Sequence, residues 1–308
     1  MQNMIIPKPL RPGDTVAMVA LASAIRSDDV PAEVKIAEER LKSVGFKVKV
    51  DPTCYSHYGF FAGTDEERAN ALNRAFADPE IDGIWCIRGG YGCIRLLELL
   101  DWDMIAQHPK AFIGYSDITT LHSVLHERCH FVTYHGPMAK SDVFDGPDLP
   151  SLMHAIAGEP DREIVNLDGS SLTTLRGGVG EGMLVGGNVC LLATSCGTPY
   201  DLDTTGKLLF LEDIGEYTYS EDRFLQQLYL AGKFDKCAGV IFGGFTGIHT
   251  EDERFGFEMD PLLEQLTAKL HVPVVSHLQA GHLPVKVTLP FGRRYRLDAD
   301  KGTLTLIG

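Results

Sequence analysis

The chain has 308 residues, of which 44% are hydrophobic and 23% charged, and its 28 Lys and Arg stand against 42 Asp and Glu for a formal net charge of -14. This composition excludes a disordered chain and is typical of a globular protein of enzyme size, and the length predicts roughly two domains. The acidic balance argues against unassisted binding to nucleic acid or to an anionic membrane surface.

The N-terminal stretch contains an apolar run at residues 15–21 that follows Lys8 and Arg11, as the core of a signal peptide would. Three prolines and Asp14 interrupt the basic region, and the run is short. We therefore interpret it as a first buried strand rather than a signal peptide. No apolar stretch of the sequence is long enough to span a bilayer.

The first half alternates short apolar runs with segments of helical period. Strands are expected at residues 15–21, 47–50, 81–87 and 111–114, and helices at 32–46, 65–77, 93–105 and 118–127. Gly45 would close the first helix, and Thr64 with Glu67 forms a capping box for the second. This alternation predicts a parallel sheet covered by helices in a three-layer α/β domain.

The pattern breaks between about residues 145 and 182, where no sustained period is found. Beyond this break, short strands are expected at 182–188, 207–213, 237–245, 272–277, 285–292, 293–300 and 302–308. One clear helix is expected at 220–232, with Ser220 as its cap. We predict an N-terminal domain at residues 1–165, a linker at 166–177 and a smaller, strand-rich mixed α/β domain at 178–308.

Residues at the ends of apolar strands are the candidates for chemistry, because ligands of open α/β sheets bind at the carboxyl ends of the strands. The glycine-rich turn at residues 87–93, which includes Arg88, could direct amides at an anion or could be merely a tight turn. Gly114 and Ser116 match the start of a G-x-S-x-G nucleophile elbow, but Ile118 stands at its last glycine, so the local residues favour Ser116 or Asp117 as a cap of the following helix.

An acid and a base follow at later strand ends. Glu212 and Asp213 end a buried run, and His282 lies in a loop bounded by Gly and Pro. His135 and His277 are rival bases. The order Ser, acid, His is that of α/β-hydrolases, but the residues alone do not decide which acid or which histidine acts.

Eight motifs together resemble the LD-carboxypeptidase family of serine peptidases, the muropeptide hydrolases. In chain order they are RGGYGCIRLLELLDW, IGYSDITTLH, YHGPM, VGGNVCLL, GTPYD, LFLEDIGE, RFLQQLYLAG and AGHLPVKVTLPFG. The resemblance implies that Ser116 is the nucleophile, Glu212 the acid and His282 the base, in an active site at the interface of the two domains. The amides of Gly90 and Asp117 would then form the oxyanion hole, and Asp117 would cap the helix.

The same resemblance implies a function in peptidoglycan recycling. The chain would remove the terminal D-alanine from a cytoplasmic muropeptide tetrapeptide, as a homodimer and without a metal or other cofactor. Arg88 is our candidate for binding a substrate carboxylate, because its planar guanidinium suits that group. The loop after Glu212 departs from the family pattern at Thr218 and Ser220, which leaves the side-chain preference open.

Two other functions fit some of these residues. The microcin C self-immunity hydrolases, which cleave aminoacyl-nucleotide conjugates, belong to the same superfamily and use the same triad. A non-catalytic module that binds muropeptides through the glycine-rich turn would need neither Ser116 nor His282. The seven scattered cysteines lack a Cys-x-x-Cys pair, so we expect reduced side chains and no structural zinc.

Overall fold

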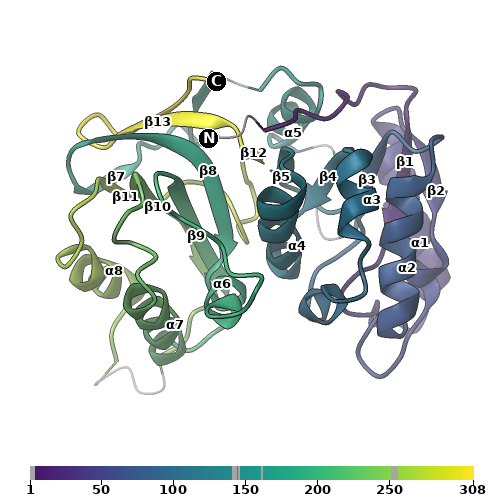
Figure 1. Cartoon of the computed structure of the whole chain (residues 1–308), viewed down its shortest axis with the longest axis horizontal. Helices are drawn as coiled ribbons and strands as arrows, with labels where there is room; N and C mark the ends of the chain where they lie inside the picture. Colours follow the sequence, from purple (N-terminus) through teal and green to yellow (C-terminus); the bar gives the residue numbers. More distant parts are fainter. Residues whose placement is uncertain (1–3, 141–143, 145, 161, 251–255) are drawn as a thin grey trace. The chain divides into compact units, whose positions relative to one another are not determined.

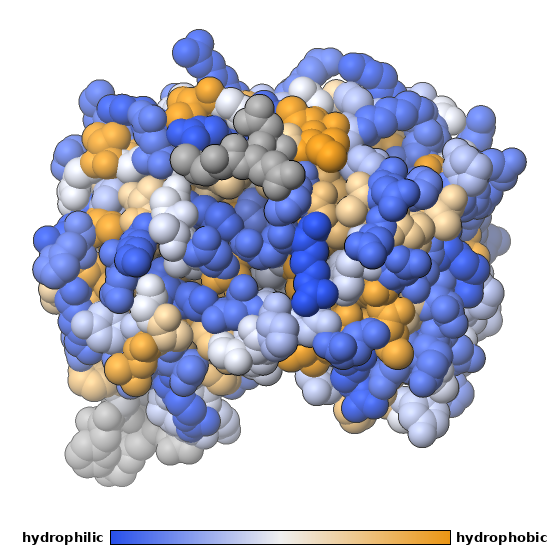
Figure 2. Space-filling model, in the orientation of Figure 1, coloured by the Kyte–Doolittle hydropathy of each residue, from blue (hydrophilic) through white to orange (hydrophobic). Residues whose placement is uncertain are grey.

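The computed structural model describes residues 4–140, 144, 146–160, 162–250 and 256–308. The chain forms two compact units, one of residues 1–160 with 288–290 (unit 1) and one of residues 161–287 with 291–308 (unit 2). Each unit is described by itself. Figure 2 shows hydrophilic side chains over much of the visible face, with hydrophobic ones in separate patches. Within the described ranges, no helix is both long and apolar enough to cross a membrane.

Unit 1 contains a six-stranded sheet (Figure 1) in the order β12-β5-β4-β3-β1-β2. Its strands are β1 (Thr15–Val19), β2 (Lys47–Val50), β3 (Gly83–Cys86), β4 (Ala111–Gly114), β5 (Thr133–His135) and β12 (Leu289–Phe291). The five strands from the first half of the chain pair in parallel. Because β1 lies between β2 and β3, the apolar run at residues 15–21 is an interior strand of this sheet.

The helices of unit 1 are α1 (Val30–Ser43), α2 (Asp65–Ala77), α3 (Trp102–Gln107), α4 (Thr119–Val124) and α5 (Leu149–Ile156). Short helical turns lie at Pro52–Tyr55, Cys93–Leu96, Ser116–Ile118 and Leu125–Cys129. The predicted capping box is confirmed, because the Thr64 side chain accepts from the Glu67 amide while the Glu67 side chain accepts from the Thr64 amide.

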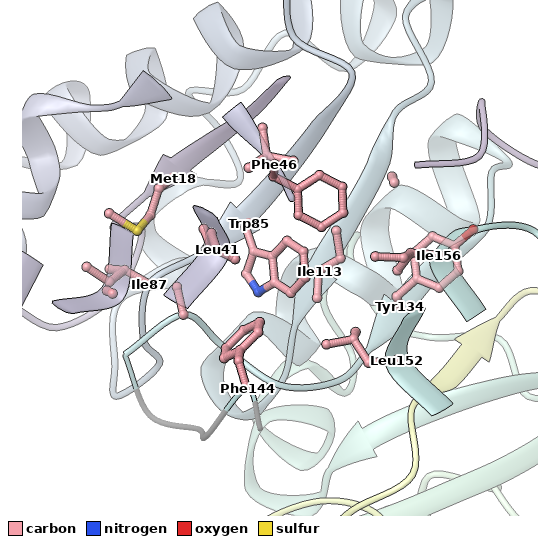
Figure 3. Packing of buried hydrophobic residues seen from close by; sticks show 14 of the residues in the cluster. Met18, Leu41, Phe46, Trp85, Ile87, Ile113, Tyr134, Phe144, Leu152 and Ile156 are labelled. Atoms are coloured by element: carbon pink, nitrogen blue, oxygen red, sulfur yellow. The ribbon is translucent and has the colours of Figure 1, made fainter. Parts of the chain in front are cut away.

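One face of this sheet packs against α1 and α5. Met18, Trp85 and Ile113 come from three neighbouring strands and share one buried cluster with Leu41 of α1 and Leu152 of α5 (Figure 3). Fully burying an apolar side chain of this size stabilises a fold by about 1.5–3 kcal/mol. The cluster therefore fixes the strands beneath these two helices.

The other face of the sheet packs against α2 and α4. Successive residues of a strand point to opposite faces, so Phe112 points away from its neighbour Ile113. The Phe112 ring centroid lies 6.3 Å from that of Phe76 in α2 and 5.5 Å from that of His122 in α4. Helices on both faces make the three layers that the sequence predicts.

Two predicted helices of unit 1 differ from the structure. Residues 93–105 do not form one helix, because the turn at Cys93–Leu96 ends before Asp101. The Asp101 side chain then accepts from the Met104 amide and begins the separate helix α3. The helix expected at 118–127 is longer and composite, because a 3-10 turn precedes α4 and a π-helical segment, Leu125–Cys129, follows it.

Unit 2 contains an eight-stranded mixed sheet in the order β6-β14-β13-β8-β9-β10-β11-β7. Its strands are β6 (Glu163–Ile164), β7 (Thr173–Arg176), β8 (Val179–Asn188), β9 (Leu208–Ile214), β10 (Gly239–Thr246), β11 (Val274–Ser276), β13 (Arg294–Asp298) and β14 (Thr303–Leu306). The central strands β8, β9, β10 and β11 pair in parallel, and the outer strands pair antiparallel. The predicted strand-rich mixed α/β architecture is confirmed.

The helices of unit 2 are α6 (Val189–Ser195), α7 (Thr218–Leu230) and α8 (Met259–Thr267). They bury Leu192, Leu225 and Leu263 in one cluster with the sheet residues Leu209 and Val240. The prediction that Ser220 caps the helix at 220–232 is wrong, because α7 begins at Thr218 with Tyr217 as its N-cap. Ser220 is buried within the first turn.

The unit boundary and the last strands differ from the expected positions. Residues 166–177, expected to be a linker, contain β7, which pairs antiparallel with β11. The Asn166 side chain also donates to the His277 carbonyl oxygen at 2.8 Å, which holds the segment to unit 2. Of the strand expected at 285–292, only Leu289–Phe291 is extended, and it joins the sheet of unit 1 next to β5.

Candidate active site

Ser116 lies in unit 1 at the turn between β4 and the helical segment that follows. Its φ angle is +65°, in the left-handed region that side chains other than glycine seldom adopt. An L-residue held there stores about 1–2 kcal/mol of strain, which is common at active sites. The Ser116 hydroxyl makes no hydrogen bond within the described ranges. The turn therefore presents an unengaged hydroxyl, as a nucleophile elbow does.

Asp117 does not cap the helix, contrary to the prediction. Its side chain is fully buried, and Oδ2 accepts a hydrogen bond from the Cys93 amide at 2.8 Å. Burial raises the pKa of Asp117, and the hydrogen bond from Cys93 opposes that rise. The Asp117 carboxyl thus ties the nucleophile turn to the glycine-rich turn that precedes it in the chain.

The glycine-rich turn packs directly on Ser116 through Gly89. A Cβ atom built on Gly89 would lie 2.9 Å from the Ser116 Cβ and 3.0 Å from its Oγ, so no side chain fits at this position. Gly90, with φ +121°, instead faces Ser23, whose Cβ would lie 2.6 Å from a Cβ at Gly90. The sequence prediction named Gly90 for its amide; the packing of Gly89 on Ser116 is a separate feature, which the adjacent glycine signals.

Buried Arg68 of α2 holds the far end of the same turn. Its Nη1 donates to the Gly92 carbonyl oxygen at 3.0 Å and to the Leu21 carbonyl oxygen at 2.6 Å, and its Nη2 pairs with Asp65. The buried guanidinium thus joins the glycine-rich turn to α2 and to the segment after β1. Nothing in the sequence pattern of residues 65–77 distinguished Arg68 from a surface arginine.

Arg88 is half-buried and is engaged mainly with the backbone. Its Nη1 donates to the Ala24 carbonyl oxygen at 2.7 Å, and its Nε donates to the Gly89 carbonyl oxygen at 3.1 Å. Burial lowers the pKa of Arg88, and the charge of Arg26 lowers it further. Its Nη2 makes no hydrogen bond to the described residues, which leaves one amino group for an anion.

Glu212 and His282 meet within unit 2. Glu212 lies near the end of β9 and is fully buried, and the His282 side chain, in the loop after β11, is 11% exposed. The His282 Nδ1 lies 2.6 Å from Glu212 Oε2, and the His282 amide donates to the same oxygen at 3.2 Å. A carboxylate at Nδ1 selects the tautomer in which Nε2 accepts a proton. The pair has the geometry of a general base with its orienting acid.

Gly281 lets the loop approach Glu212 this closely. Its φ angle is +95°, and a Cβ atom built on it would lie 2.6 Å from Glu212 Oε2 and 2.8 Å from Glu212 Cβ. Sequence reasoning did not single out Gly281, although a glycine next to a candidate base was a signal for a close approach of the backbone.

Asp213 accepts hydrogen bonds from Asn188 and from the backbone, whereas its neighbour Glu212 is paired with His282. Its Oδ1 accepts from Asn188 Nδ2 at 2.6 Å, and its Oδ2 accepts from the Cys190 amide in the first turn of α6 at 2.9 Å. Burial raises the pKa of Asp213 to about 6, against the hydrogen bond from Cys190. The alternation of side chains along β9 explains why adjacent acids have different partners.

The rival histidines lie elsewhere in the two units. His135 is buried in β5, with its ring 5.8 Å from that of Tyr115. His277 follows β11, where Nε2 lies 3.4 Å from an Asp260 carboxylate oxygen. Among the described residues, His277 is not paired with Glu212 or Asp213. In the part of the chain that the structure describes, no group of three or more His, Cys, Asp or Glu residues could hold a metal ion.

Comparison with known proteins covers both units. Residues 16–136 match the LD-carboxypeptidase N-terminal domain, and residues 181–297 match the LD-carboxypeptidase C-terminal domain. A probable murein peptide carboxypeptidase of Bacillus subtilis is 34% identical over 97% of this chain and 93% of its own length. A murein tetrapeptide carboxypeptidase of Pseudomonas aeruginosa is 32% identical over 93% of this chain and 94% of its own length.

Solved structures give a similar result. The muramoyltetrapeptide carboxypeptidase from Oxalobacter formigenes has a TM-score of 0.79 at 30% identity, covering 95% of this chain and 97% of that one. The microcin C7 self immunity protein MccF, in complex with aspartyl sulfamoyl adenosine, has a TM-score of 0.86 at 23% identity, covering 99% of this chain and 98% of that one. At 23% identity, the similarity to the microcin C7 self immunity protein shows a shared fold alone.

Proposed function

Because the chain belongs to the LD-carboxypeptidase family, we propose that it removes the terminal D-alanine from peptidoglycan-derived tetrapeptides with Ser116, His282 and Glu212 as its catalytic triad. The chain is a serine-type carboxypeptidase. The names of two relatives more than 30% identical to it, one acting on murein peptides and one on a murein tetrapeptide, support this substrate class.

The pairing of His282 with Glu212 is the observation that carries the proposed mechanism. His282 Nε2 takes the proton of the Ser116 hydroxyl as the oxygen attacks the carbonyl before D-alanine. Glu212, 2.6 Å from His282 Nδ1, stabilises the imidazolium that forms. The imidazolium then gives its proton to the leaving amine, and a water molecule releases the acyl group from Ser116 by the same steps.

Attack on the carbonyl develops negative charge on its oxygen. We assign the stabilisation of this oxyanion to the backbone amides of Asp117 and Gly90. Losing one such donor typically costs about 3 kcal/mol of transition-state stabilisation. The contact of Gly89 with Ser116 supports this assignment, because it brings the glycine-rich turn to the nucleophile.

The remaining parts of the proposal concern the substrate and the setting. Arg88 binds a substrate carboxylate through its remaining amino group, which makes it a local cation in an acidic protein. The enzyme acts as a cytoplasmic homodimer on peptides recovered during cell-wall recycling. Its reaction needs no metal or cofactor, because the triad supplies the nucleophile, the base and the acid.

The test is release of D-alanine from a tetrapeptide that ends in this residue, followed by mass spectrometry. Wild-type protein should release D-alanine, and Ser116→Ala and His282→Ala should each lower kcat by about 10⁴-fold or more. Tetrapeptide with a terminal L-alanine is the matched control substrate. Equal release by wild type and Ser116→Ala would refute the proposed nucleophile.

An aminoacyl-adenylate analogue belongs in the same assay. The similarity to the microcin C7 self immunity protein extends to the fold at 23% identity, so it does not favour a nucleotide substrate. Cleavage of the analogue without release of D-alanine would replace the proposed function with that of an aminoacyl-nucleotide hydrolase. Binding of the tetrapeptide without cleavage of either compound would indicate a non-catalytic binding module.

A further inference from the structure

Unit 1 has a cavity of about 500 Å³ between the segments at residues 24–30 and 55–60. Polar and aromatic side chains line it, among them Arg26, Tyr55, Ser56, His57 and Phe60. Its volume is within the range of pockets that bind small ligands, about 300–1,000 Å³. No part of the proposed catalytic mechanism uses these residues.

The wall of the cavity is held to the nucleophile turn through Arg88. Ala24 lines the cavity, and its carbonyl oxygen accepts a hydrogen bond from Arg88 Nη1 at 2.7 Å. The next residue after Arg88 is Gly89, which packs on Ser116. These contacts, from Ala24 to Arg88 and from Gly89 to Ser116, connect the wall of the cavity to the nucleophile turn.

The charged group of the cavity is the exposed guanidinium of Arg26. It makes no hydrogen bond or ion pair with any residue that the structure describes. Its positive charge also contributes to the lowered pKa of Arg88, after the larger effect of burial. Of the two acids that follow Arg26 in the chain, Asp29 is engaged as the N-cap of α1, where it accepts from the Ala32 amide, and exposed Asp28 forms no ion pair with Arg26 among the described residues. An exposed arginine that lines a cavity without a carboxylate partner among the described residues favours an anionic ligand.

Exposed aromatic rings also line this cavity. Phe60 is 48% exposed, and its ring centroid lies 4.2 Å from that of buried Phe61 and 6.0 Å from that of Tyr91, which is 47% exposed. Tyr55, which also lines the cavity, is 48% exposed. Large exposed rings held in a cluster are typical of a binding surface, where they cover the apolar carbon atoms of a ligand.

We propose that this cavity, the Arg26 subsite, binds the carboxylate on the second residue of the tetrapeptide, with Phe60 and Tyr55 against the adjoining carbon atoms of the substrate. The inference rests on the proposed function. Peptidoglycan tetrapeptides carry glutamate at their second residue, so they supply a carboxylate in the part of the substrate that remains after D-alanine leaves. Arg26 is then a specificity residue, and the triad does not depend on it.

The test compares two tetrapeptides that differ only in the second residue, one with a free carboxylate and one with the corresponding carboxamide. Wild-type protein should favour the carboxylate about tenfold in kcat/KM, the size of a net charge-assisted hydrogen bond. Arg26→Gln should bring this ratio close to one, chiefly by lowering kcat/KM for the carboxylate peptide, and Arg26→Lys should retain part of the preference. Phe60→Ala should raise KM for both peptides equally.

Arg11→Gln is the matched control. Arg11 is an exposed residue of unit 1 that pairs with Glu159, and its substitution changes the net charge by the same amount without touching the cavity. This variant should keep the wild-type preference. An unchanged preference in Arg26→Gln, or an equal loss of both substrates, would overturn the Arg26 subsite.

Failure of the proposed function is distinguishable from failure of the subsite. If wild-type protein releases D-alanine from neither peptide, the proposed function fails. Calorimetric titration of the two uncleaved peptides into Ser116→Ala then measures the subsite directly. Tighter binding of the carboxylate peptide that is lost in the double variant with Arg26→Gln supports the subsite, and equal binding of both peptides overturns it.

Discussion

Substitution of Gly281 by alanine tests whether the Glu212–His282 pair needs the close approach of its loop. The added Cβ would lie 2.6 Å from Glu212 Oε2, 2.7 Å from its Cγ and 2.8 Å from its Cβ. Rotation of the carboxylate relieves only the first of these contacts. The loop must therefore move away from β9, and His282 moves with it because it is the next residue.

The size of the effect follows from two contributions. An L-residue at the φ angle of +95° costs about 1–2 kcal/mol, and overpacking of a filled site costs about 1–3 kcal/mol. The free energy of unfolding should fall by about 2–5 kcal/mol in total. A displacement of the base by about 1 Å should lower kcat/KM by about 100-fold.

Gly197→Ala is the control for backbone strain. Gly197 also belongs to unit 2, has a φ angle of +78°, and has no atom within 4 Å of an added Cβ. It should lose about 1–2 kcal/mol of unfolding free energy and keep wild-type kcat/KM. Urea unfolding and D-alanine release measure the two quantities. If Gly281→Ala matches Gly197→Ala in both, the proposed dependence of His282 on the close approach is refuted.

Two further predictions concern single residues. Ser116→Gly and Ser116→Ala should both be inactive. In urea unfolding, Ser116→Gly should be more stable than Ser116→Ala by about 1 kcal/mol, because glycine tolerates the φ angle of +65°. Equal stabilities of the two variants would show that the turn is unstrained. Burial raises the pKa of Glu221 from 4.5 to about 9. Between these pH values the folded protein binds a proton that the unfolded chain does not, so the free energy of unfolding of the wild type falls as pH rises, by at most about 1.4 kcal/mol per pH unit. The stability of Glu221→Gln relative to wild type should therefore grow from about pH 5 to about pH 9, and a constant difference would contradict the shift.

Glu221 shows what sequence reasoning could not find. Both of its carboxyl oxygens are buried and lack a hydrogen-bond partner in the described parts of the chain, and Asp213, Glu216 and Glu212 add to the rise of its pKa. In the sequence it is one acid among many, in a helix where exposed acids are common. Only the packing of α7 reveals that it is buried.

Local signals predicted the elements whose causes are local. The capping box of Thr64 and Glu67, the apolar run of β1 and the glycine after α1 each involve residues close together in the chain. The helix expected at residues 93–105 was wrong because Asp101 begins a new helix there. The strand at Leu289–Phe291 joins the sheet of unit 1 although its neighbours belong to unit 2, and no local pattern encodes that choice.

For the candidate site, too, local sequence signals identified some features and tertiary packing decided the others. The sequence by itself determined that a serine, an acid and a histidine follow strand ends in the order of α/β-hydrolases, because apolar runs and turn residues mark those ends. Tertiary structure decided that Glu212 rather than Asp213 meets His282, because neighbouring side chains on β9 point to opposite faces. It also decided the positive φ angle of Ser116 and the close approaches of Gly89 and Gly281, since these depend on atoms brought together from distant parts of the chain.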